Sequence, residues 1–144
     1  MCGIAGLIHK GKTVNIGKEL QDMLQALKHR GPDSTGFALY SQGNNQGDYI
    51  MRFKVGENVA EGSTAVNEDK SVYDARRKEV DKHIRDLGGS IVNDAQLTPY
   101  SFRYCIKYDK DLMEFSKKIE SVEMTEILSL GKSLELVKDI GDAS

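Results

Sequence analysis

The sequence has 144 residues, of which 39% are hydrophobic and 29% are charged, and its formal net charge is −2. This length suits one domain of ordinary size with a lean core. The balanced charge gives no reason to expect nucleic acid or a membrane surface as a partner. No run of about 18 apolar residues is present to span a membrane. Two cysteines make no disulfide framework, so we expect a reducing, cytoplasmic setting.

A strand and an amphipathic helix are the first elements expected along the chain. Residues 2–9, CGIAGLIH, are apolar and small, which predicts a buried strand. Apolar residues then recur at helical spacing, and Asn15 is placed to cap the helix they form. The apolar positions of this helix are Ile16, Leu20, Met23, Leu24 and Leu27. The cationic residues 28–30 suit the end of the helix, and the following glycine and proline stop it.

Two strands and a polar stretch follow this helix. Residues 37–41, FALYS, predict a short strand, and residues 49–56, YIMRFKVG, predict a second one of similar length. The stretch between them is rich in turn residues, so we expect the two strands to pair as a hairpin. From residue 57 to residue 70 the sequence becomes polar, with Gly, Asn and Ser, and predicts a loop or linker.

The second half of the chain predicts two helices and two pairs of strands. A helix is expected over 72–87, with an apolar face and a solvated face that carries the basic run 76–78. The apolar face comprises Val72, Ala75, Val80, Ile84 and Leu87. Strands at 90–97 and 99–108, a helix at 109–122 and a strand–turn–strand hairpin at 124–141 complete the order. This order predicts an α+β fold with mostly antiparallel sheets.

The second residue of the chain carries the first feature with chemical meaning. If Met1 is removed, Cys2 bears a thiol with a pKa of about 8.5 beside an α-amine with a pKa of about 7.7–8.0. The amine can accept the thiol proton and later return it to a leaving amine. Gly3 would let a substrate carbonyl approach the backbone. Position alone leaves an alternative, because an ordinary buried thiol at the start of a strand also explains Cys2.

A second motif follows the first helix. Residues 29–36, HRGPDSTG, can be explained structurally as a cationic helix end, a capping glycine, a proline stop and a polar turn. Together, however, CGIAG at the N-terminus and ALKHRGPDSTG at 26–36 resemble the class II glutamine amidotransferases. These are N-terminal-nucleophile hydrolases, and the family includes glutamine-dependent asparagine synthases, phosphoribosylpyrophosphate amidotransferases and glutamate synthases. The resemblance covers residues 2–55.

The resemblance implies a fold, a reaction and a set of site residues. The fold would be the N-terminal part of a four-layer αββα sandwich whose nucleophile opens a strand. Cys2 would attack the side-chain amide of glutamine, release ammonia and form a γ-glutamyl thioester that water hydrolyses to glutamate. Arg30 would help to order the site. The substrate pocket would include Gly3, Gly31, Asp33 and Ser34, without a chemical step for the last two.

The chain departs from the family pattern in its later part. It contains no R-x-A-T motif to bind the glutamine carboxylate, no Asn-Gly pair for the oxyanion and no evident aspartate for the glutamine amine. Losing one oxyanion donor typically slows a reaction about 10²- to 10³-fold. We therefore expect the N-terminal portion of a longer polypeptide, or a site completed by a second chain, and little activity from this chain alone.

The C-terminal stretch suggests how the chain is divided. Residues 127–141, ILSLGKSLELVKDIG, resemble an amidotransferase-subunit subgroup tied to glutamate synthase and N-methylglutamate synthase complexes. In that subgroup a small α/β insert interrupts the sandwich. The expected division is amidotransferase domain over 1–57, insert over 58–130 and return to the amidotransferase domain over 131–144.

Two functions remain open from the sequence. The first is a glutamine amidotransferase whose partners are glutamine and a synthase-type subunit or domain that consumes the ammonia. The alternative is a non-catalytic regulatory or assembly module that keeps the N-terminal-nucleophile scaffold, which the missing motifs favour. No cofactor is expected, and no metal, because His9, His29 and His83 lack ligand partners at metal spacing. Cys105 lies in a strand of alternating residues and is expected to be structural or at the surface.

Overall fold

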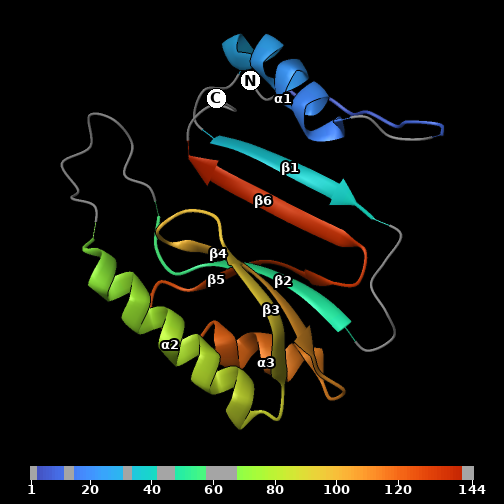
Figure 1. The fold of residues 1–144 in the computed structure, drawn as a ribbon. Helices are drawn as coiled ribbons and strands as arrows, with labels where there is room; N and C mark the ends of the chain where they lie inside the picture. The colour runs from blue at the N-terminus through green and yellow to red at the C-terminus, as the bar shows by residue number, and fades with distance from the viewer. Residues whose placement is uncertain (1–2, 12–14, 31–33, 42–47, 58–67, 141–144) are drawn as a thin grey trace. The chain divides into compact units, whose positions relative to one another are not determined.

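The computed structural model describes residues 3–11, 15–30, 34–41, 48–57 and 68–140 (Figure 1). These residues form three α-helices, a short 3₁₀ helix and six strands, and the strand pairs with a defined register are antiparallel. The fold is therefore α+β, as the element order predicts. The chain forms two compact units, one made by residues up to 36 together with those from 138 onward, the other by residues 37–137.

The first unit contains helix α1 (Ile16–Ala26) and the 3₁₀ helix η1 (Lys28–Arg30). The Asn15 side chain accepts a hydrogen bond from the Lys18 backbone N–H at 3.2 Å, which confirms the expected N-cap. The strand expected at 2–9 is wrong over residues 3–9, which have no ladder partner in the part of the chain that is described. Ile4 and Ile8 are 94% and 90% exposed there, so this stretch is not buried either.

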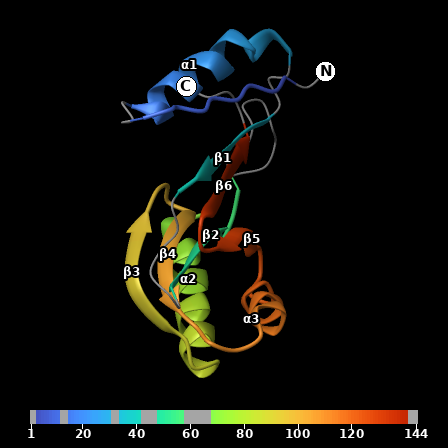
Figure 2. The same cartoon turned by 90° about the vertical axis from the view of Figure 1, so that its right-hand side faces the viewer.

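The second unit is built on a four-stranded sheet with the order β3-β4-β2-β5 (Figure 2). Strand β2 (Asp48–Lys54) lies in its centre, between β4 (Ser101–Lys107) and β5 (Glu126–Gly131), and β3 (Ser90–Gln96) lies at one edge. Helices α2 (Lys70–Asp86) and α3 (Leu112–Ile119) pack against one face, which we call the helix face. The opposite face is called the outer face.

The core of this unit lies between the helix face and the two helices. Strand alternation places apolar side chains on that face, and α2 and α3 cover them. Burying each such side chain contributes about 1.5–3 kcal/mol. Fully buried members are Met51, Phe53, Val55, Val80, Ile84, Phe102, Tyr104, Ile106, Phe115 and Ile119. The alternation predicted for 99–108 is confirmed, since Phe102, Tyr104, Ile106 and Tyr108 are all buried.

Helix α2 differs in detail from its predicted amphipathic pattern. Ala75, expected on the apolar face, is exposed, and Tyr73 is buried instead. The basic run is not a solvated face, because Arg76 is buried and donates to the Val55 carbonyl at 3.0 Å and to Glu68. The Arg77 guanidinium lies 4.8 Å from the centre of the Phe102 ring. Long arginine stems can cover apolar surface while their heads find acidic partners, which the hydrophobic pattern alone does not reveal.

Two hairpins were expected, one between residues 37–41 and 49–56 and one over 124–141, and the observed strand pairing differs from both. Strand β1 (Ser34–Tyr40) pairs with β6 (Leu134–Ile140) in a separate two-stranded sheet, whereas β2 pairs with β4 and β5. The hairpin expected between 37–41 and 49–56 is therefore wrong. Strands β5 and β6 follow each other across a tight turn, as predicted, but they belong to different sheets. Long-range partners decide these pairings, and local turn signals do not contain that information.

Candidate functional site

Most of the site residues expected from the sequence cannot be placed. Cys2, Gly31 and Asp33 lie outside the described residues, and the Arg30 backbone ends η1 while its side chain is not described. Gly3 is described and is half-buried. Ser34 is exposed and is the first residue of β1. The described residues thus include three of the six positions, Arg30 through its backbone alone, and no contact among the three is defined.

A side-chain contact connects the segment that follows Gly3 to helix α1. A ring nitrogen of His9 lies 2.9 Å from a carboxylate oxygen of Glu19, a residue of the first turn of α1. The pair is partly exposed, with side-chain exposures of 28% and 43%, so it contributes about 0–1 kcal/mol. This contact connects the described stretch 3–11 to α1.

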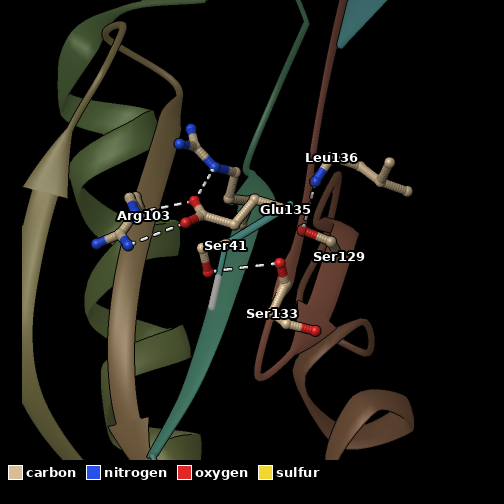
Figure 3. A network of polar contacts seen from close by, with 7 residues as sticks. Ser41, Arg103, Ser129, Ser133, Glu135 and Leu136 are labelled. Atoms are coloured by element: carbon tan, nitrogen blue, oxygen red, sulfur yellow. Dashed lines mark hydrogen bonds and ion pairs between the residues drawn. The ribbon is translucent and has the colours of Figure 1, made fainter. Parts of the chain in front are cut away.

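The described residues contain a polar cluster that the sequence did not predict (Figure 3). Glu135, near the start of β6, is buried and accepts hydrogen bonds from two arginines of the outer face. Arg52 Nε lies 2.6 Å from Glu135 Oε2, and Arg103 donates through Nε at 2.9 Å and Nη2 at 3.0 Å. We call Arg52, Arg103 and Glu135 the arginine–glutamate triad.

The triad belongs to one cross-strand row of the sheet. Arg52 on β2 is directly opposite Arg103 on β4 and Ser129 on β5. Ser129 Oγ accepts the backbone N–H of Leu136 at 2.9 Å, beside Glu135 (Figure 3). All three residues of the row therefore form hydrogen bonds with the start of β6, two with the Glu135 side chain and one with the Leu136 backbone. Side chains make this junction, because β5 and β6 share no ladder.

The electrostatics of the triad follow from its burial and its hydrogen bonds. Burial acts to raise the pKa of Glu135, but the hydrogen bonds from Arg103 and Arg52 outweigh it and lower the pKa below the ordinary value. The hydrogen bond to Glu135 raises the pKa of Arg103, against the opposing effect of burial. Glu135 is therefore a stable carboxylate at neutral pH and has no proton to exchange in catalysis.

A second polar network joins the sheet to α2. The Tyr104 hydroxyl donates to Asp81 at 2.7 Å and accepts from Arg77 Nε at 2.8 Å. Arg77 also donates to Asp94 on β3. Burial, with the hydrogen bond to Asp81, raises the pKa of Tyr104 well above its ordinary value of 10.0. A tyrosine held neutral in this way links elements of the core and is a poor general base.

Cys105 can be compared with the proposed nucleophile. It is partly buried on β4, and burial together with the nearby Asp48 carboxylate raises the pKa of its thiol. A raised pKa lowers the thiolate fraction, and the thiolate is the reactive form. Of the two cysteines, Cys105 is therefore poorly suited to nucleophilic attack, in agreement with the structural or surface role expected from the sequence.

Within the described residues, no group of three or more His, Cys, Asp or Glu side chains is arranged to hold a metal ion. None of the helices in the described part of the chain combines the length and the apolar character needed to cross a membrane.

Two known proteins are similar to this chain in sequence. A protein of Methanothermobacter thermautotrophicus named "Putative glutamine amidotransferase" is 32% identical over 145 residues, which covers 98% of this chain and 44% of that protein. A protein of Methanocaldococcus jannaschii named "Putative asparagine synthetase (glutamine-hydrolyzing) 2" is 51% identical over 41 residues, covering 28% of this chain and 8% of that protein. The chain thus spans less than half the length of these relatives. No protein-family model matches it.

Proposed function

Since this chain is a relative of the class II glutamine amidotransferases, we propose that it carries the nucleophile of a glutaminase whose ammonia is passed to a synthase. One observation carries this proposal: similarity to a protein named as a glutamine amidotransferase extends over 98% of the chain. The motifs around Cys2 and Arg30 supply the chemistry that such a relative would need. The proposal concerns the complete protein, because the chain spans 44% of that relative.

The proposed reaction begins once Met1 has been removed. The α-amine of Cys2 takes the thiol proton, and the thiolate attacks the side-chain amide carbon of glutamine. The C–N bond breaks, and the amine returns the proton so that ammonia leaves. The remaining γ-glutamyl thioester reacts with water, which cleaves the C–S bond, gives glutamate and restores the thiol. Cys105 is a poor candidate for this role, because burial raises the pKa of its thiol and lowers the thiolate fraction.

The surrounding residues take supporting roles in this proposal. Arg30 orders the site, and Gly3, Gly31, Asp33 and Ser34 line the substrate pocket. The scaffold is the N-terminal part of an αββα sandwich over 1–57 and 131–144, interrupted by an α/β insert over 58–130. The ammonia passes to a synthase-type partner subunit or domain in the cytoplasm. Residues that bind the glutamine carboxylate and the oxyanion come from a continuing polypeptide or a second chain.

Glutamate release from glutamine by the complete protein tests this proposal. Cys2→Ala should abolish the release, because no other group in the proposal can form the thioester. Cys105→Ala is the matched control, since it removes the other thiol of the chain and should leave the rate within about twofold. Unchanged turnover in Cys2→Ala would refute the mechanism. A complete protein that binds glutamine without any turnover would support the non-catalytic alternative.

A further inference from the structure

The arginine–glutamate triad leaves one guanidinium edge unused. Arg52 contacts Glu135 through Nε alone, and within the described residues its Nη1 and Nη2 have no protein partner. Arg103 instead turns its Nε and Nη2 edge to the same carboxylate. The free edge of Arg52 is the terminal fork, whose two parallel N–H groups match the two oxygens of a carboxylate.

This fork is held in a fixed position and remains within reach of solvent. The side chains of Arg52 and Glu135 are 13% and 12% exposed, so packing restrains both. Arg103 fixes Glu135 from the other side with two hydrogen bonds. Among the described side chains, Asp48 Oδ1 is the one polar atom that is buried and has no hydrogen-bond partner. The terminal nitrogens of Arg52 also have no partner there, so they are not buried and solvent can reach them. A small anion can therefore reach a preorganised donor pair.

The charges of the triad favour a further anion. Two guanidinium groups and one carboxylate leave an excess of one positive charge in a largely buried position. Partly buried charges destabilise the folded state unless they are paired, because they lose hydration. An anion at the Arg52 fork would neutralise the excess.

Neighbouring carboxylates compensate this charge only weakly. Glu57 and Glu126 bind Lys54, which is two residues from Arg52 on β2, at 2.8 and 3.1 Å, and their side chains are 52% and 56% exposed. Solvent and salt screen charges at such positions. Asp48 is on the same face of β2, four residues from Arg52, which corresponds to about 13 Å along a strand. Because the Coulomb attraction falls as the inverse of distance, it is about a third as strong at that separation as at 4 Å.

We infer that the terminal fork of Arg52 is a binding site for the carboxylate group of a small molecule on the outer face of the sheet. A single carboxylate matches both the fork geometry and the one excess charge. A phosphate dianion would replace an excess positive charge by an excess negative one. The site uses no residue of the proposed glutaminase centre, so the inference of a carboxylate site does not depend on the glutaminase proposal.

The test is a titration of the full chain with acetate, at constant ionic strength, followed by NMR of the arginine side-chain nitrogens. Saturable shifts centred on Arg52 are expected. Arg52→Lys keeps the charge but removes the fork, and should weaken acetate binding by about tenfold or more. Lys107→Gln removes a cation from the same face of β4 and should change the affinity by less than about twofold. Urea unfolding shows whether each variant is folded.

Three results would overturn the inference. The first is acetate binding without saturation, which would indicate general charge screening. The second is equal weakening by Arg52→Lys and Lys107→Gln, which would assign the effect to net charge instead of the fork. The third is tighter binding of inorganic phosphate than of acetate, measured in the same way. Cys2→Ala should leave the acetate affinity unchanged, so a failure of the glutaminase proposal is seen separately.

Discussion

Arg52 and Glu135 lie 83 residues apart in the sequence, and Arg52 Nε donates to Glu135 Oε2 across 2.6 Å. The pair joins the central strand of the four-stranded sheet to the start of β6, which pairs with β1 in the other sheet. Ser129 supports the same junction by accepting the Leu136 N–H. Side-chain contacts from one cross-strand row therefore connect two sheets that share no backbone ladder.

Glu135→Gln should weaken this junction strongly. The amide leaves two arginines facing a neutral group, and breaking a buried ion pair costs about 3–5 kcal/mol. Arg103 is 31% exposed, and solvent screens part of its interaction with Glu135. We therefore expect the free energy of unfolding to fall by about 3 kcal/mol, the lower end of this range. Urea unfolding of the chain measures the loss. Glu126→Gln is the matched control, since its carboxylate is 56% exposed and its ion pair with Lys54 is worth about 0–1 kcal/mol. Equal losses in both variants would refute the assignment.

The stabilising effect of Glu135 should disappear in acid. Its pKa lies below the ordinary value of 4.5 in the folded chain, because the hydrogen bonds from Arg103 and Arg52 outweigh the effect of burial. The contribution is therefore complete above about pH 4.5 and is lost as the pH falls through the lower folded value. Unfolding free energies of the wild type and Glu135→Gln should converge between pH 7 and pH 3. A constant difference over this range would contradict the charge assignment.

Tyr104→Phe should destabilise the chain through the second polar network. The change removes a hydroxyl that bonds to Asp81 and Arg77 and leaves both charged groups with one partner fewer. Hydrogen bonds to charged groups contribute about 1.5–3 kcal/mol, so we expect a loss of about 2 kcal/mol in urea unfolding.

Tyr108→Phe is the control for that prediction. Tyr108 is also buried in the core, but its hydroxyl makes no hydrogen bond with the described residues. We expect its unfolding free energy to change by less than about 0.5 kcal/mol. A larger loss in Tyr108→Phe than in Tyr104→Phe would show that ring packing, and not the hydroxyl network, accounts for the effect.

Gly88→Ala should cost about 1–2 kcal/mol, because Gly88 ends α2 with φ +88°, a conformation that side chains with a Cβ disfavour. A Cβ there would also lie 2.9 Å from Lys110 Nζ, which has to move. At Gly131 a Cβ would make an ordinary contact of 3.7 Å with the Leu134 carbonyl. Gly131→Ala should therefore be nearly neutral in thermal unfolding, and a reversed order would contradict the backbone argument.

Local patterns predicted the elements of the second unit well. The alternation in SFRYCIKY identified β4 and its buried side chains. The double glycine at 88–89 marked the end of α2. These signals are encoded within a few residues, so sequence reasoning can use them.

Long-range relationships were not predictable in the same way. The strand order and the triad depend on contacts between residues far apart, such as Arg103 and Glu135. Nothing near Arg52 or Arg103 in the sequence indicates that the start of β6 meets them. The one available signal was the arginine in the middle of an otherwise apolar strand, YIMRF. Cys2, Gly31 and Asp33 stay predictions, because they lie outside the described residues.

Covalent labelling of the complete protein by a diazoketone analogue of glutamine, read by intact mass and peptide mapping, tests the central claim most directly. The account predicts a protein without Met1 that gains one label on Cys2, no label in Cys2→Ala and full labelling in Cys105→Ala. Retention of Met1, or a label on Cys105 in place of Cys2, would contradict it.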